Sequence, residues 1–259
     1  MQLPFRLRAF SLHLAASAGV LALVLLALYL GWYRWPGWYL TGVPHVAAIM
    51  VGVDAALGPT LTLLIANPRK PRRELARDIG VIVAVQLVAL VYGTATLWQG
   101  RPLYYTFSED RLEIVQASAL LPQEIALARQ QNPALAPHWF SLPRWVFAPL
   151  PEDPDTRARI IASAITEGQD VIDMPRYFRP WQQGLPALRQ QLKTVDAIKI
   201  FSRVERQVLK ERVSELGLSA DQPIASFMTG PDTRLLVVFD PATLSIRAFI
   251  PPPATRTAR

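Results

Sequence analysis

Three long apolar runs near the start of the chain limit what it can fold into more than any other feature. They cover residues 9–31, 44–66 and 79–98, and each is 20 to 23 residues long. At about 1.5 Å per residue, a helix of this length crosses the roughly 30 Å of hydrocarbon in a bilayer. The sequence therefore predicts three transmembrane helices, with the lipid bilayer as the solvent of the first 101 residues.

Basic residues between these runs predict which side of the membrane each loop occupies. Arg6 and Arg8 precede the first run, and five Lys or Arg residues lie between positions 69 and 77, whereas the loop between the first two runs carries only Arg34. The positive-inside rule then places the N-terminus in the cytoplasm and everything after Arg101 outside it. Up to Arg101 there are nine basic and three acidic residues, against eighteen and seventeen beyond it. The net charge of +7 is thus a topology signal, and we expect no binding of nucleic acid.

Residues 102–259 have the length of one soluble domain and a nearly balanced charge. Strand-like segments stand at both ends of this stretch and helical segments in its middle, a pattern typical of an α+β domain. We predict strands at residues 103–107, 112–115, 145–148, 224–228, 235–239 and 245–250, and helices at 155–167, 186–193 and 202–216, with one short helix in the proline-rich segment 121–150. The predicted fold is therefore a three-helix transmembrane anchor, residues 1–101, followed by an extracytoplasmic α+β domain, residues 102–259.

Neither half contains a residue pattern typical of catalysis or of metal binding. There is no cysteine, the three histidines stand at positions 13, 45 and 138, and the HExxH, GxSxG, P-loop and GxGxxG motifs are absent. One charged group is typical of a solvated loop and also of a carboxylate pair for acid–base chemistry. Its members are Glu167, Asp170, Asp173, Arg176 and Arg179. We interpret it as a loop, and we expect no enzyme activity, cofactor, metal or small-molecule substrate.

Two polar residues inside the predicted spans point to a site within the membrane. Asp54 lies near the middle of the second span, where an acid costs roughly 2.5–3.5 kcal/mol on insertion scales. Gln86 lies at nearly the same depth in the third, antiparallel span, so a hydrogen bond between the two is one interpretation. Gly58 and Pro59 follow Asp54, and Pro59 cannot donate to the carbonyl of Ala55. The other interpretation is therefore a polar notch, formed by Asp54, Gly58, Pro59 and Gln86, that binds a partner.

A ridge of small residues occupies another face of the second span. Ala48, Gly52 and Ala56 recur every four residues, the spacing at which transmembrane helices pack closely. Asp54 is two positions from Gly52 and so points away from this ridge. We predict that the ridge serves close packing between helices.

Several segments together resemble a known family. The second span reads Gly52-Val-Asp54-x-x-x-Gly58-Pro59-x-x-Thr62. The outer domain contains Arg101-Pro102-x-Tyr104-x-x-Phe107-x-x-Asp110-Arg111-x-Glu113-x-Val115 and Pro175-Arg176-Tyr177-Phe178-x-Pro180. With the order of spans and the closing hairpin, the chain resembles the TfpX/TfpZ type IV pilin accessory proteins of Gram-negative inner membranes. Residues 120–149 match least.

The resemblance implies a function and a location. It implies an accessory protein of the bacterial inner membrane, with a periplasmic outer domain, that assists a type IV major pilin before pilus assembly, as a pilin-binding chaperone or an assembly modulator. It also assigns motif positions in the outer domain to Arg101, Pro102, Tyr104, Asp110, Arg111, Arg176 and Tyr177. The alternative from the residues alone is a membrane enzyme or proton-coupled transport component that uses Asp54. Three spans without an inverted repeat are a poor transporter, which favours the first function.

The topology is testable with alkaline phosphatase, which is active only outside the cytoplasm. A fusion after Arg259 should be active, and a fusion within residues 67–77 should be inactive, because the five basic residues of that loop hold it in the cytoplasm. Phosphatase activity in whole cells, normalised to fusion protein, is the measurement. An inactive C-terminal fusion or an active loop fusion would contradict the topology.

Overall fold

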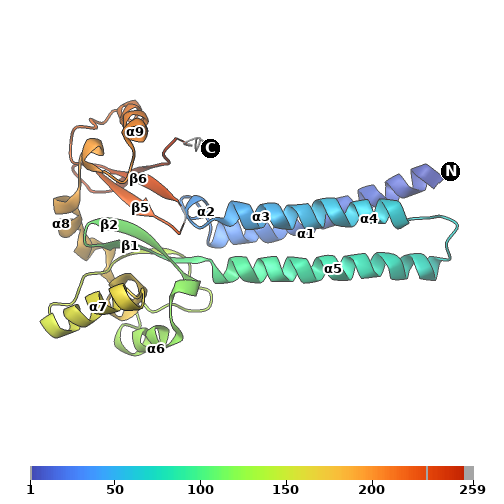
Figure 1. Cartoon of the computed structure of the whole chain (residues 1–259), viewed down its shortest axis with the longest axis horizontal. Helices are drawn as coiled ribbons and strands as arrows, with labels where there is room; N and C mark the ends of the chain where they lie inside the picture. Colours follow the sequence, from blue (N-terminus) through green and yellow to red (C-terminus); the bar gives the residue numbers. More distant parts are fainter. Residues whose placement is uncertain (1, 232, 254–259) are drawn as a thin grey trace. The chain divides into compact units, whose positions relative to one another are not determined.

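In a computed structural model, the chain forms two compact units, residues 1–101 and 102–259 (Figure 1). The structure describes residues 2–231 and 233–253, so the end of the predicted outer domain, residues 254–259, lies outside the described part. The first unit is helical, and the second is a sheet with surrounding helices.

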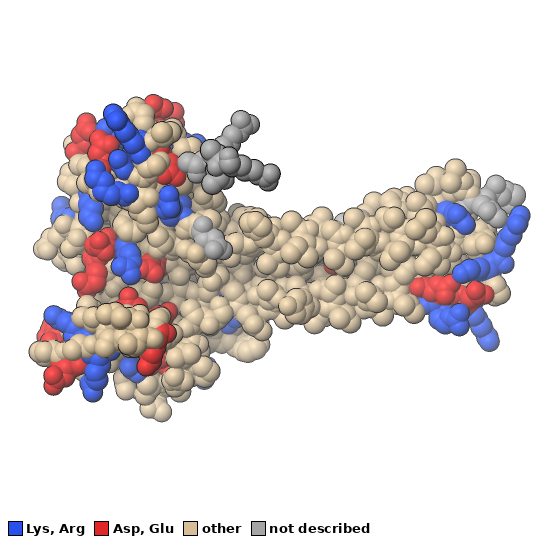
Figure 2. Space-filling view, viewed as in Figure 1, with Lys and Arg blue, Asp and Glu red and all other residues tan. Residues whose placement is uncertain are grey.

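The helical unit contains three helices that are long and apolar enough to cross a membrane, as predicted. The first is α1 (Gln2–Gly31) and the third is α5 (Arg72–Gln99). The second span is continuous from α3 (Val43–Val51) through a π-helical segment, η1 (Gly52–Leu57), to α4 (Gly58–Ile65). A short helix, α2 (Gly37–Leu40), lies in the loop between the first two spans. The helices α1 and α5 start several residues before their apolar runs, because a helix continues into polar sequence beyond the hydrocarbon. On the visible face of this unit, charged side chains gather at the end with the α4–α5 loop and leave most of its length uncharged (Figure 2).

Apolar packing holds the three helices together along their length. Leu21, Val43 and Met50 belong to one buried cluster that joins the spans. Gly93 in α5 is required for this packing, since a Cβ there would lie 2.7 Å from the Met50 side chain. Where α1 and α5 finish, the ring centroids of Trp32 and Trp98 are 4.8 Å apart in an edge-on arrangement. Aromatic residues at this end are typical of the boundary between lipid and water.

A curled, mixed, seven-stranded sheet forms the centre of the second unit. Its strand order is β4-β3-β1-β2-β5-β6-β7. The predicted N-terminal hairpin is confirmed, because β1 and β2 pair antiparallel. Two pairs are parallel, β1 with β3 and β2 with β5, so the sheet is not a simple meander. The strands are β1 (Pro102–Ser108), β2 (Arg111–Gln116), β3 (Arg144–Phe147), β4 (Arg179–Pro180), β5 (Ala225–Thr229), β6 (Arg234–Phe239) and β7 (Ile246–Ile250).

Helices pack on the two halves of this sheet and create two cores. One core joins α9 (Arg203–Glu215) to β5, β6 and β7 through Leu209, Val213 and Leu236. The other joins α7 (Pro154–Thr166) to β1, β2 and β3 through Ile160 and Val146. In Figure 1, α6 (Pro122–Gln131) and α7 accordingly lie at one end of the sheet and α9 at the other.

One helix differs from the prediction. We expected a helix at residues 186–193, whereas α8 spans Trp181–Gln191 and contains Pro186. A proline removes only one helical hydrogen bond, and tertiary packing outweighs that loss here. Gly184 allows the packing, because a Cβ at this position would lie 2.7 Å from the Phe147 ring.

Candidate functional site: a polar cluster in the helical unit

Four polar residues from all three spans meet inside the helical unit. His13 of α1 lies with its Nδ1 atom 2.6 Å from the Thr62 hydroxyl of α4 and its Nε2 atom 2.8 Å from the Gln86 Oε1 atom of α5. The Gln86 amide donates from Nε2 to the main-chain carbonyl of Asp54, at 2.9 Å. The cluster therefore joins the three helices through side chains that lipid cannot replace as hydrogen-bond partners.

The donor and the acceptor of each hydrogen bond in this cluster follow from its geometry. Because the Gln86 amide nitrogen donates to the Asp54 carbonyl, its oxygen is left to accept, and His13 must donate from Nε2. A neutral His13 then accepts at Nδ1 from the Thr62 hydroxyl. Three hydrogen bonds thus run in series from the Thr62 hydroxyl through His13 and Gln86 to the Asp54 carbonyl.

A proline explains why Gln86 is needed. In the segment Gly52–Leu57 the helix has π geometry, and the Gly58 N–H accordingly donates to Val53, five residues back. In the same register the next N–H would donate to Asp54, but the next residue is Pro59, which has none. Gln86 supplies the missing donor from another helix. We expected the carbonyl without a main-chain donor to be that of Ala55. Because the π turn contains one extra residue, it is the carbonyl of Asp54, and the Gln86 side chain binds it.

The carboxylate of Asp54, unlike its carbonyl, takes no part in these hydrogen bonds. The residue is only 4% exposed. Among the described residues, the structure gives this carboxylate no hydrogen-bond partner and no cation. A hydrogen bond between Asp54 and Gln86, one of the two interpretations of the sequence, is therefore present, but the amide binds the main-chain carbonyl of Asp54 and not its carboxylate. A buried acid without a partner is costly, and such residues inside spans mark functional sites.

Gly58 makes the approach of Gln86 possible. A Cβ on Gly58 would lie 2.1 Å from the Gln86 amide nitrogen. Gly58, Pro59 and Thr62 are buried on the same side of the span as Asp54. The predicted notch residues are therefore brought together, and His13 and Thr62 complete them. Sequence reasoning missed His13; its signal was a histidine in an otherwise apolar run.

The ridge of small residues faces the other way. Ala48, Gly52 and Ala56 are exposed, and a Cβ on Gly52 would meet nothing within 4 Å. Among the described residues, the three spans do not pack on one another through this ridge, and its role in helix packing stays a prediction. Ala47 and Met50, at positions beside it, are buried in the bundle instead, and Gly58 and Gly93 provide the close approaches.

The N-terminal motif residues of the outer domain are structural anchors. Tyr104 is fully buried in β1, donates from its hydroxyl to the Leu135 carbonyl at 2.6 Å and packs edge-on against Phe178. Burial raises the pKa of Tyr104 to about 12. Pro102 begins β1, and Arg101, the last residue of the helical unit, lies 4.2 Å from the Trp98 ring.

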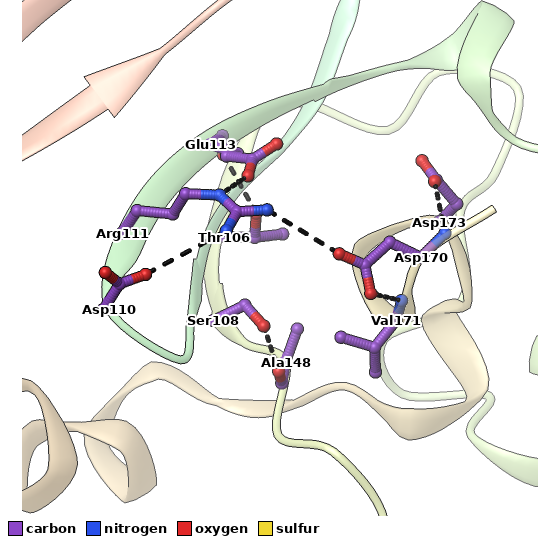
Figure 3. Close-up of polar contacts among 9 residues, drawn as sticks. All are labelled: Thr106, Ser108, Asp110, Arg111, Glu113, Ala148, Asp170, Val171 and Asp173. Atoms are coloured by element: carbon purple, nitrogen blue, oxygen red, sulfur yellow. Dashed lines mark hydrogen bonds and ion pairs between the residues drawn. The ribbon is translucent and has the colours of Figure 1, made fainter. Parts of the chain in front are cut away.

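The turn between β1 and β2 holds an ion network (Figure 3). Arg111 lies at its centre, bonded to Glu113 and 3.7 Å from the Asp170 carboxylate. Asp110 is 4.0 Å from Arg111, and it is 3.5 Å from Lys193. Asp173 accepts from the Asp170 N–H at 3.1 Å. In the described residues no group of three or more acidic or histidine side chains is arranged to hold a metal ion.

The PRYF motif lies apart from this network. Arg176 donates to Glu124 of α6 at 2.9 Å, and both side chains are largely buried. Arg176 also lies over the Tyr177 ring. Within the acidic group predicted near Arg176, Asp170 instead pairs with Arg111, because folding brings the β1–β2 turn to Asp170. These paired ions are typical of a structural loop.

Comparison with known proteins gives relatives for most of the chain. It is 24% identical over 192 residues to a fimbrial assembly protein of serogroup I from Dichelobacter nodosus, covering 73% of this chain and 72% of that protein. It is 25% identical over 210 residues to the serogroup E1 protein, covering 78% of each. A protein of serogroups C1 and C2 is 28% identical over 124 residues, 48% of this chain and 95% of that protein. No protein-family model matches, and no solved structure does. Over about three quarters of its length, the chain is thus similar to fimbrial assembly proteins.

Two glycine substitutions test the polar cluster. Gly58→Ala should displace the Gln86 amide and leave the Asp54 carbonyl without a donor, an unmade buried hydrogen bond that costs about 1–3 kcal/mol. Gly52→Ala is the matched control in the same π segment, since its Cβ enters open space. Unfolding of both variants in detergent, followed by circular dichroism, measures the difference. Equal stability of the two variants would contradict the cluster.

A pH experiment tests the outer network. Burial first, and then the neighbouring Asp170 and Glu113 charges, raise the pKa of Asp173 to about 6. An unfolded aspartate titrates near 3.9, so the folded domain binds a proton that the unfolded chain does not between about pH 4 and pH 6. The ionised carboxylate therefore destabilises the fold progressively from about pH 4 to pH 6, and fully above pH 6. Asp173→Asn should protect β1 and β2 amides from hydrogen exchange more than wild type at pH 7.5, and equally at about pH 3, below both pKa values. A difference as large at pH 3 as at pH 7.5 would contradict this assignment.

Proposed function

We propose that this chain is an inner-membrane accessory protein of type IV pilus biogenesis, of the TfpX/TfpZ kind, that binds a major pilin. The similarity to fimbrial assembly proteins over about three quarters of the chain supports the pilus role. Three apolar helices support an integral membrane location. The proposed topology places the N-terminus in the cytoplasm and the outer domain in the periplasm, because the basic residues gather in the α4–α5 loop.

A single observation carries the proposed binding site: Asp54 is buried within the spans, and its carboxylate has no hydrogen-bond partner among the described residues. The main-chain cluster does not use this carboxylate, so stability does not account for it. A partner that brings a hydrogen-bond donor or a cation to Asp54 would recover the cost of its burial. The N-terminal amine of a processed pilin is such a cation.

The location of Asp54 in the π segment supports the same proposal. π-helical turns are frequent at functional sites. The opposite face of this segment carries the exposed ridge of Ala48, Gly52 and Ala56. A pilin helix could approach closely along these small residues.

The second candidate function is proton-coupled transport or membrane catalysis through Asp54. His13 favours it, because Gln86 joins His13 to the main chain of Asp54, and histidines and acids within spans are typical of proton relays. Yet the three spans contain no inverted repeat, and the outer network holds paired ions. We therefore propose a non-enzymatic binding protein, acting without a cofactor or a small-molecule substrate.

An isosteric substitution separates these functions. Asp54→Asn removes the charge and leaves the Asp54 carbonyl and Gln86 in place, so the protein should accumulate in the membrane at the wild-type level. Its crosslinking to the co-expressed major pilin, from a photoreactive residue at the exposed position Ile49, should fall at least about tenfold, the effect of 1.4 kcal/mol.

Asp54→Glu is the companion variant, because it keeps the charge. A proton carrier should keep some function with glutamate and lose it with asparagine, without any change in pilin crosslinking. Wild-type crosslinking by Asp54→Asn at wild-type protein level would contradict pilin recognition through Asp54.

A further inference from the structure

The sheet of the outer domain curls so strongly that its two ends approach each other. Four strands, β1, β2, β5 and β6, separate β3 from β7 in the strand order. At about 4.8 Å between neighbouring strands, a flat sheet would keep β3 and β7 about 24 Å apart. The rings of Trp145 in β3 and Phe249 in β7 nevertheless stack, with their centroids 6.1 Å apart. The sheet therefore curves as the wall of a barrel does.

This curl does not close into a barrel. In the part of the chain that the structure describes, no pairing joins β4 to β7, so both strands are edges. The strand β4 has only two residues, whereas β7 has five and pairs with β6 alone. Main-chain N–H and C=O groups of an antiparallel strand point alternately toward its partner and away from it. The outer side of β7 is therefore a row of hydrogen-bonding groups on which a further strand can pair.

A mostly apolar cavity lies between these two edges. Its volume is 470 Å³, a size typical of binding pockets. Residues from both ends of the sheet line it: Leu135, Trp145, Pro180, Trp181 and Gln182 near β3, β4 and the start of α8, and Leu244, Ser245 and Ile246 at the start of β7. Neighbouring strands place the side chains of one face next to each other. A strand paired with β7 would thus direct every second side chain toward the cavity that Ile246 lines.

The charged residues of these strands favour one kind of partner. The strands β3, β4 and β7 each carry one arginine, Arg144, Arg179 and Arg247, and none of them carries an acid. Arg247 is exposed and lies where the β6–β7 register shifts. An exposed arginine and an irregular register on an edge disfavour pairing with a second copy of this chain, because like charges would meet. Acidic side chains on a different strand would be attracted instead.

From these observations we propose that the β7 edge binds an extended, acidic segment of a partner protein as an additional strand, with an apolar side chain in the cavity beside Trp145 and Trp181. Main-chain hydrogen bonds to β7 would supply affinity, and the cavity and the arginines would supply specificity. The added strand would lie between β7 and β4 and cover the edge of β7. This inference depends neither on Asp54 nor on pilin binding.

Two peptide probes test the charge preference. The full chain in neutral detergent is titrated into a fluorescent peptide of about six residues, the length of a typical strand, in which valine alternates with glutamate. A matched peptide replaces glutamate with lysine, and fluorescence anisotropy measures both affinities. The glutamate peptide should bind at least about tenfold more tightly, and Arg247→Glu should reverse this preference. Binding of neither peptide, equal binding of both, or a preference that Arg247→Glu leaves unchanged would overturn the proposal.

A pair of neighbouring variants tests the cavity. Gln182→Trp fills it from α8 and should weaken binding of the glutamate peptide at least about tenfold. Gln183→Trp is the matched control, because Gln183 is also exposed on α8 but does not line the cavity. Equal affinities of the two variants would overturn the role of the cavity. Unchanged circular dichroism checks that both chains, and the Arg247→Glu chain, keep their fold.

Methylated peptides test the main-chain pairing. Methyl groups on the main-chain nitrogens of all valines, or of all glutamates, remove the donors from one edge of the peptide or from the other. A strand that pairs with β7 needs one of these edges, so at least one methylated peptide should lose binding. Undiminished binding of both would overturn the pairing with β7. Pilin crosslinking by the Arg247→Glu chain tests the proposed function separately.

Discussion

The amide of Gln86 donates to the main-chain carbonyl of Asp54, and the arrangement of the helical unit depends on this contact. In the hydrocarbon core of a bilayer there is no water to donate a hydrogen bond to an unpaired carbonyl. Pro59 removes the helical donor, the π turn determines which carbonyl loses it, and Gly58 leaves room for the replacement from α5. His13 then donates to the Gln86 side-chain oxygen and bonds to the Thr62 hydroxyl, which joins α1 to the same point. One local defect in the second span thereby specifies how all three helices meet.

The Asp54 carboxylate takes no part in these contacts. Its carbonyl is satisfied and its side chain is not, although both belong to one residue. Natural sequences keep such local inconsistencies mainly where function requires them. The main-chain part of the cluster therefore contributes to stability, and the proposed function uses the carboxylate. The Gly58-Pro59 pair stands where the π turn that contains Asp54 ends.

The outer domain depends on a different constraint, the short connection to the membrane. Only Gly100 and Arg101 separate α5 from β1. The parallel pairing of β1 with β3 then brings the start of β3 to the same end of the sheet as the start of β1. Tyr104, Arg111 and Arg176 stabilise this domain through burial and ion pairs, which gives these residues a role in its folding.

The sequence by itself determined the three spans and the N-terminal hairpin, because apolar length and local alternation are properties of neighbouring residues. It also identified Asp54, Gly58, Pro59 and Gln86, since polar residues and a proline are conspicuous in an apolar run. Only the tertiary structure decided that Gln86 binds a carbonyl, that His13 joins it and that the Ala48, Gly52 and Ala56 ridge faces outward. The π turn changes the phase of the helix, and no count of residues at regular helical spacing reveals such a change. Likewise the parallel strand pairs, and the meeting of Arg111 with Asp170, required contacts between segments far apart in the chain, for which the sequence carries no local signal.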